Sequence, residues 1–236
     1  KKIEYIPKFD EKIKIILNTS DKVFEPTATS DFLISAVGSN INQIDKLLDL
    51  GCGNGIVGIS LSKLNKAKKI YFSDISDEAV KITKSNIKLN DCNGEAIRSN
   101  IFSNWHGFKF DTIVDDISGI SEEVAKLSNW FRNVPCDAGQ DGTANIETVL
   151  NEAKNFLTTN GQLFFPVISL SNTKKIIEIA NNNFKNIKKI SHNQWFLPDD
   201  LFSNFSILEE LKKKGSIDYC QKFGKLICWT DIYSAI

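Results

Sequence analysis

The sequence contains no methionine, and only two of its 29 basic residues are arginines, Arg98 and Arg132. The 29 acidic residues balance the 29 basic ones, so the formal net charge is zero. A dedicated nucleic-acid-binding protein usually presents a basic, arginine-rich surface, and this composition therefore argues against DNA or RNA as a partner. Because methionine is absent even from position 1, we expect the sequence to be trimmed or incomplete at its start.

Long apolar runs and paired cysteines are also missing. No run of 18 apolar residues exists, so the sequence predicts no membrane span, and the charged first 17 residues do not resemble a signal peptide. The five cysteines are odd in number and form no C-x-x-C pair, which argues against a metal site or a disulfide framework. We expect no metal and a cytoplasmic location.

Short apolar segments alternate with helical patterns along most of the chain. The expected strands are 47–50, 68–74, 95–99, 110–116, 162–169, 186–197 and 225–236. The expected helices are 55–65, 77–90, 121–131 and 145–157, the last ending near Asn160-Gly161. Strands and helices that alternate at this spacing predict an α/β fold, with a mostly parallel sheet covered on both faces.

The chain length fits one domain with an elaboration. We expect residues 1–30 to form a short N-terminal extension and residues 31–236 to form the main domain. An insertion around 197–215, consisting of a loop and a helix, is expected within that domain.

The stretch LLDLGCGNGIVGIS places Gly51, Gly53 and Gly55 directly after the first strand of the alternating pattern. The dinucleotide fingerprint G-x-G-x-x-G fails here, because Ile56 stands at its third glycine. Asp74 ends the next strand, 23 residues after Gly51, where a carboxylate can accept hydrogen bonds from both ribose hydroxyls. The loop and the carboxylate together predict a nucleoside site, and the alternative is a tight turn with a helix-capping aspartate.

The segments LLDLGCGNG and FSDISDEAVKITKSNIKLN resemble the class I S-adenosylmethionine-dependent methyltransferases. They are nearest to the branch that methylates amide or amine nitrogens, including release-factor glutamine and ribosomal-protein methyltransferases. That branch reads "LDLGCGTG", then "DIS" with "EAL…A..N", then "DLF", then "FDLIVSNPPY". The likeness runs from about Val23 to Ser169. It implies a Rossmann-like, doubly wound, seven-stranded sheet, mostly parallel with an antiparallel last strand, and S-adenosylmethionine as the cofactor.

The resemblance also implies which residues bind the cofactor. They are Asp49, Gly51, Gly53, Asp74, Ile75, Asn100, Ile101 and Thr29. The two glycines would let the backbone pass the amino-acid end, where Asp49 would fix the loop or reach the amino group. Asp74 would hold the ribose and Ile75 the adenine face. Asn100 replaces the usual aspartate of "DLF", and its amide oxygen can still accept from the adenine amino group. Thr29 would sit near the cofactor carboxylate.

The family's "NPPY" corresponds here to Asp116-Ile117-Ser118-Gly119, so both prolines and the aromatic residue are gone. Asp115 and Asp116 are adjacent, and their side chains diverge if strand geometry persists. We expect Asp116 to face the substrate and Asp115 the cofactor, both as catalytic residues, because a carboxylate attracts a cationic nitrogen or accepts its proton. The alternative is that both only satisfy loop N–H groups or cap the helix at Ser121.

The sequence therefore predicts a methyltransferase that acts on a nitrogen of an amine, guanidine or amide. The expected partner is a small molecule or a peptide, with no nucleic acid and no membrane, and the oligomeric state is left open. One alternative is a protein glutamine or lysine methyltransferase. Another is a non-catalytic scaffold subunit that binds the cofactor, which the loss of "NPPY" keeps open.

Overall fold

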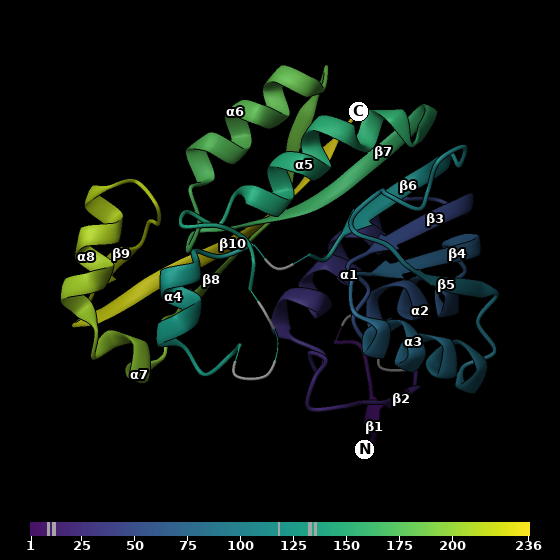
Figure 1. The fold of residues 1–236 in the computed structure, drawn as a ribbon, viewed down its shortest axis with the longest axis horizontal. Helices are drawn as coiled ribbons and strands as arrows, with labels where there is room; N and C mark the ends of the chain where they lie inside the picture. The colour runs from purple at the N-terminus through teal and green to yellow at the C-terminus, as the bar shows by residue number, and fades with distance from the viewer. Residues whose placement is uncertain (9, 11–12, 118, 132–133, 135) are drawn as a thin grey trace. The chain divides into compact units, whose positions relative to one another are not determined.

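The structure is a computed structural model, and it describes residues 1–8, 10, 13–117, 119–131, 134 and 136–236. The chain forms two compact units (Figure 1). The first unit comprises residues 1–117, 152–165 and 236, and the second comprises residues 118–151 and 166–235. The strand β7, Leu157–Ile168, runs from the first unit into the second.

The first unit is built on parallel strands in the order β5-β4-β3-β6-β7. These are β3 (Ile44–Leu50), β4 (Ala67–Asp74), β5 (Gly94–Arg98), β6 (Phe110–Asp115) and the first part of β7. The apolar middles of β3, β4 and β6 are buried, as expected for strands covered on both faces. Their carboxyl ends therefore lie along one edge, where parallel α/β sheets bind ligands.

Two helices pack on these strands, α2 (Ile56–Lys63) and α3 (Asp77–Leu89) (Figure 1). The side chain of Ser76 caps α3 by accepting from the N–H of Ala79, and Asp77 and Glu78 follow in the first turn. Acidic residues are favoured at this end of a helix because they complement its dipole. This local pattern determines where α3 begins, directly after the carboxyl end of β4.

The N-terminal residues form the antiparallel pair β1 (Lys2–Tyr5) and β2 (Ile15–Asn18), followed by α1 (Ala28–Asn40). Buried asparagines of α3 and its C-terminal end anchor β2. Asn86 accepts from the N–H of Asn18 and donates to its carbonyl, and Asn90 makes the same pair of bonds with Ile16. The extension is therefore tied to α3 by four hydrogen bonds to the backbone of β2.

The second unit holds β10 (Lys225–Ala235), which pairs antiparallel with β8 (Ile187–Phe196) and with the short β9 (Cys220–Lys222). Its helices are α4 (Glu122–Leu127), α5 (Ala144–Glu152), α6 (Thr173–Asn183), α7 (Asp199–Phe202) and α8 (Phe205–Lys213). Apolar side chains from α4, α7, α8 and β10 share one core, which includes Val124, Leu201, Leu208 and Cys228. The segment 197–215 thus contains two helices rather than one.

The strand order of the whole sheet is β5-β4-β3-β6-β7-β10-β8, with β9 added beside β10. The predicted Rossmann-like α/β fold, mostly parallel with an antiparallel strand, is confirmed. Two predicted helix ends are wrong. The helix expected over 121–131 ends at Leu127, and α5 with a short 3-10 turn, Ala153–Asn155, ends before Asn160-Gly161, which lie inside β7. None of the helices that the structure describes combines the length and the apolar character of a membrane span.

Candidate functional site

The glycine loop follows β3 and turns through three left-handed positions. Gly51, Gly53 and Gly55 have φ values of 77°, 53° and 84°. Residues with side chains rarely adopt this region, whereas glycine does so readily. A Cβ atom on Gly51 would lie 2.6 Å from Cγ1 of Ile117, so this glycine also permits a close approach of the segment that follows β6. By contrast, the nearest atom to a Cβ on Gly53 would be 3.9 Å away.

Asp74, at the carboxyl end of β4, is bonded to this loop. Its Oδ2 accepts from the N–H of Gly53 over 3.0 Å, and its Oδ1 accepts from the N–H of Ser76 over 2.9 Å. Burial raises the pKa of Asp74, although these backbone bonds oppose the rise. The N–H of Ile75 adds a third backbone bond, and a carboxylate can accept about four, so Asp74 can still accept a further hydrogen bond.

Asp49 lies inside the sheet, within β3. It is fully buried, and its Oδ2 accepts from the N–H of Gly58 in α2 over 2.8 Å. Its Oδ1 is buried without a hydrogen-bond partner. Burial raises the pKa of Asp49 to about 7, and the charge of Asp74 adds to the rise. Asp49 therefore ties β3 to α2 and keeps one oxygen unsatisfied.

Asp115 and Asp116 follow the same edge, at the end of β6. The N–H of Asp116 donates to the carbonyl of Leu50, and buried Asp115 accepts from the N–H of Ile117 over 3.0 Å. Burial raises the pKa of Asp115 to about 7. The pKa of Asp116 is raised well above its usual range by burial, and further by the charges of Asp49, Asp115 and Asp74. The structure thus brings four predicted carboxyls together.

The predicted adenine side is formed by Ile75, Asn100 and Ile101. The Ile75 side chain is 57% exposed, although it follows a buried strand. The N–H of Ser99 donates to the carbonyl of Asp74, which holds the β5 turn beside β4. Ile101 has φ of 49°, a strained value for a β-branched residue, and such strain concentrates at functional sites.

Thr29 lies in the first turn of α1 and is partly exposed. Among the described residues, no hydrogen bond or ion pair links it to another predicted site residue. Its neighbour Ser30 is the residue of that turn that hydrogen-bonds to Asp116. Ser118, of the predicted substrate segment, lies outside the described residues. Sequence reasoning missed Ser30, although TATS places several hydroxyls at the start of the helix.

Two further residues that sequence reasoning missed hold the glycine loop in shape. The side chain of buried Asn54 donates to the carbonyl of Phe24, and its oxygen accepts from the N–H of Ile56. Thr83 of α3 donates to the carbonyl of Gly53 over 2.9 Å. The only sequence signal for Asn54 is its place between the glycines.

These residues fit a cationic nucleoside. Asp74 keeps acceptor capacity for a ribose hydroxyl, and the exposed Ile75 offers an apolar surface to a base. The unpartnered Oδ1 of Asp49 lies among carboxyls that have no ion-pair partner in the ranges described, which suits a positively charged ligand. These carboxylate acceptors therefore match the sulfonium nucleoside that the resemblance implies.

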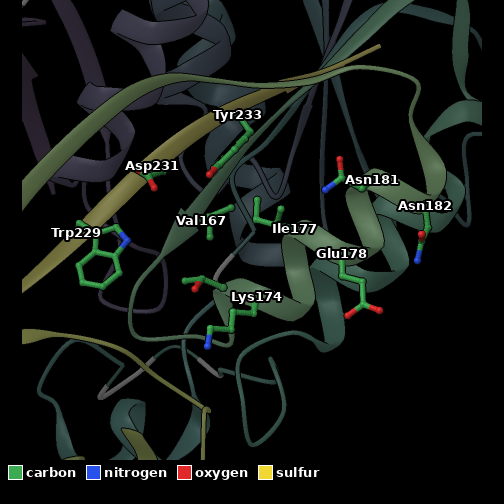
Figure 2. Close-up of a pocket in the computed structure, with 10 residues that line it drawn as sticks. Val167, Lys174, Ile177, Glu178, Asn181, Asn182, Trp229, Asp231 and Tyr233 are labelled. Atoms are coloured by element: carbon green, nitrogen blue, oxygen red, sulfur yellow. The ribbon is translucent and has the colours of Figure 1, made fainter.

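A separate pocket of about 560 Å³ lies in the second unit (Figure 2). It is lined by β10 residues Trp229, Asp231 and Tyr233 and by the side chains of α6, such as Glu178. The buried Asp231 is already paired with His192 over 2.5 Å and with Lys189 over 3.2 Å, both from β8. None of the predicted site residues lines this pocket.

The glycine loop after β3 and the carboxylate after β4 define the nucleoside-binding edge of a Rossmann-like enzyme. Residues 19–116 match the family model described as the methyltransferase small domain. A "Putative protein N5-glutamine methyltransferase" from Methanocaldococcus jannaschii is 31% identical over 167 residues, 71% of this chain and 82% of that protein. The chain belongs to the class I S-adenosylmethionine-dependent methyltransferases, in the branch of the release-factor glutamine and ribosomal-protein methyltransferases.

Other relatives agree with this membership. The ribosomal protein uL3 glutamine methyltransferase of Francisella tularensis is 31% identical over 62% of this chain, which spans only 45% of that protein. A ribosomal protein L11 methylase structure from Lactobacillus delbrueckii has a TM-score of 0.61 at 18% identity, covering 98% of this chain and 90% of that one, and it supports the fold alone. The predicted family, the methyltransferase class and S-adenosylmethionine as the cofactor are confirmed.

Proposed function

We propose that this chain transfers the methyl group of S-adenosylmethionine to a side-chain amide nitrogen of a protein or peptide, in the cytoplasm. The observation that carries the proposal is the pair of bonds from Gly53 and Ser76 to Asp74, which aims one carboxylate at the edge where the glycine loop opens. The names of the relatives support a glutamine amide as the acceptor.

We assign the cofactor's parts to the residues as the sequence predicted. Asp74 holds the ribose hydroxyls, while Ile75 and Ile101 contact the adenine, whose amino group donates to Asn100. Gly51 and Gly53 leave room for the amino-acid end, and Asp49 lies beneath it. The exposure of Ile75 and the unpartnered Oδ1 of Asp49 support these roles, because both are left unsatisfied by the protein itself. Thr29 is assigned no role, because Ser30 is the residue of that turn that hydrogen-bonds to Asp116.

Asp116 is assigned to the acceptor and Asp115 to the cofactor side. The bound cofactor supplies an activated methyl group on a positively charged sulfur, so the protein has to align the nitrogen and exclude water. The residue Asp116 keeps part of its surface exposed although its carboxyl is buried enough to raise its pKa, whereas Asp115 is buried and bonded to the N–H of Ile117, which supports this division of roles. An ionised Asp116 accepts a hydrogen bond from an amide N–H and orients its nitrogen.

A second candidate acceptor is an amine, such as the lysine side chain. The observation that favours it is the carboxyl of Asp116 where the family pattern has an asparagine, because a carboxylate pairs with a cation. The two acceptors differ in their pH dependence. An amine has to lose a proton before it attacks, so its rate rises with pH toward the amine pKa, whereas an amide shows no such rise.

The test uses the purified chain, S-adenosylmethionine carrying a labelled methyl group, and matched peptide libraries that differ only in glutamine or lysine. We expect label in glutamine peptides, located by mass spectrometry, and loss of at least about tenfold in turnover for Asp116→Asn with S-adenosylhomocysteine binding retained. Label in lysine peptides alone would favour the amine. Cofactor binding without transfer to any nitrogen would identify a scaffold and contradict the proposal.

A further inference from the structure

The carboxyl cluster of the first unit, Asp49, Asp74, Asp115 and Asp116, lacks a basic partner. None of the four forms an ion pair within the ranges that the structure describes. The Ser30 hydroxyl of α1 and the thiols of Cys52 and Cys92 also interact with members of the cluster, and burial raises the pKa of both thiols. The unpartnered, buried Oδ1 of Asp49 lies in the same cluster.

Two of the four carboxyls, Asp115 and Asp116, are adjacent in the sequence where β6 ends. The register places Asp115 beside Leu50, directly after Asp49 on the neighbouring strand, so this pair joins Asp49 of β3 and Asp74 of β4. Buried carboxylates without a countercharge are costly, and such groups take up protons instead.

Asp116 is the member of the cluster that interacts electrostatically with all three of the others. Its carboxyl interacts with the charges of Asp49, Asp115 and Asp74, and the hydrogen bond with Ser30 opposes their effect. Burial and these neighbouring carboxyls therefore raise the pKa of Asp116 in the free protein and favour its neutral form. A positively charged ligand in the cluster reverses this, because it stabilises the carboxylate.

We propose that Asp116 gives up its proton when the cationic cofactor binds and takes one back from the nitrogen that is methylated. This inference rests on the proposed function. The sulfur–methyl bonding pair stays on sulfur, the nitrogen lone pair forms the new bond, and the nitrogen proton moves to the Asp116 carboxylate. The cluster loses the positive charge of the sulfonium and gains a proton, so its net charge is unchanged by the reaction.

The two forms of the cofactor, before and after methyl transfer, should therefore release different numbers of protons when they bind. S-adenosylmethionine and S-adenosylhomocysteine share the same amino, carboxylate and ribose groups, and they differ in the charge on sulfur. Binding of the first therefore releases about one more proton than binding of the second. Below the pKa of Asp116, the preference for the cationic ligand grows about tenfold for each unit of pH.

The experiment titrates each ligand into the purified chain by calorimetry, near pH 7, in buffers that differ in ionisation enthalpy. When the observed binding enthalpy is plotted against the ionisation enthalpy of the buffer, the slope gives the number of protons released. We expect a difference of about one proton between the two ligands in the wild type. In Asp116→Asn both ligands still bind and the difference disappears, whereas in Asp91→Asn, an exposed control beyond α3, it persists.

Equal proton counts for the two ligands in the wild type would overturn the inference and leave the proposed function standing. A difference that survives in Asp116→Asn would assign the proton to another group and equally overturn it. Absence of binding by either ligand would contradict the proposed function itself, and the inference with it.

Discussion

The backbone N–H of Gly53 donates to Oδ2 of Asp74 over 3.0 Å, so the glycine loop and the carboxylate after β4 form one unit. The two residues come from different βα turns, after β3 and after β4. Because Gly53 has φ of 53°, its N–H points at the carboxylate without strain. The loop therefore positions the acid as well as leaving space for a ligand.

Gly51→Ala tests the close approach at this loop. The new methyl group would lie 2.6 Å from Cγ1 and 2.9 Å from the backbone nitrogen of Ile117, at a φ of 77°. Gly107→Ala is the matched control, because Gly107 has φ of 82° but nothing within 4 Å. We expect Gly51→Ala to lower the free energy of unfolding by about 1–3 kcal/mol more than Gly107→Ala, as measured by urea denaturation. Equal losses would show that only the backbone conformation matters.

Asp49→Asn tests the electrostatics of the cluster. Folding raises the pKa of Asp49 from 3.8 to about 7, so the native state binds the proton more tightly than the unfolded chain. The stability contributed by that proton is fully present below about pH 4 and is lost as pH rises to about 7, roughly 4 kcal/mol at most.

The Asp49→Asn variant has no titrating proton at this position, and the oxygen of the new amide can still accept from the N–H of Gly58. The difference in unfolding free energy between the variant and the wild type should therefore grow in favour of the variant from about pH 4.5 to about pH 8. Urea titrations at both pH values measure it. A difference that is independent of pH would mean that Asp49 titrates normally in the folded protein.

Asn86→Ala tests the anchoring of the N-terminal strands. Buried Asn86 makes three hydrogen bonds, to the N–H and carbonyl of Asn18 and to the carbonyl of Asn54. Removing it leaves buried backbone groups unsatisfied, so we expect a loss of about 3 kcal/mol in stability. Ser85→Ala, which removes one bond to the Asn18 side chain, should cost less than about 1 kcal/mol. Similar costs in thermal denaturation would contradict this account.

Ile75→Ala tests the adenine contact. Because Ile75 is 57% exposed, its truncation should change the free energy of unfolding by less than about 0.5 kcal/mol. Affinity for S-adenosylhomocysteine should fall about fivefold, which corresponds to about 1 kcal/mol of lost apolar contact. Leu89→Ala, whose side chain is 41% exposed at the end of α3, should leave affinity unchanged. An unaltered dissociation constant for Ile75→Ala would exclude the contact.

Local patterns predicted most of the fold, because buried parallel strands are short apolar runs between helical patterns. The strands β3, β4 and β6 lie where LLDL, KKIYFSD and FDTIVDD predicted them. The failure at Asn160-Gly161 has a tertiary cause. A Cβ on Gly161 would lie 2.9 Å from the carbonyl oxygen of Phe110, so the strand uses glycine for close approach rather than for a helix end.

The missed residues share one property, which is that their partners are distant in the sequence. Ser30 bonds to Asp116, Asn54 donates to the carbonyl of Phe24, and Thr83 donates to the carbonyl of Gly53. No local spacing encodes such pairs. The raised pKa of Asp116 likewise depends on burial and on carboxyls from β3, β4 and β6, which only the sheet brings together.

The most direct test is a calorimetric titration of S-adenosylhomocysteine into the wild type, Asp74→Asn and Asp91→Asn. The account predicts saturable binding to the wild type and to Asp91→Asn, and an affinity at least about tenfold weaker for Asp74→Asn, because one ribose acceptor is replaced by a donor. Wild-type protein that does not bind, or Asp74→Asn protein that binds equally well, would contradict the claim that Asp74 holds the ribose of the cofactor.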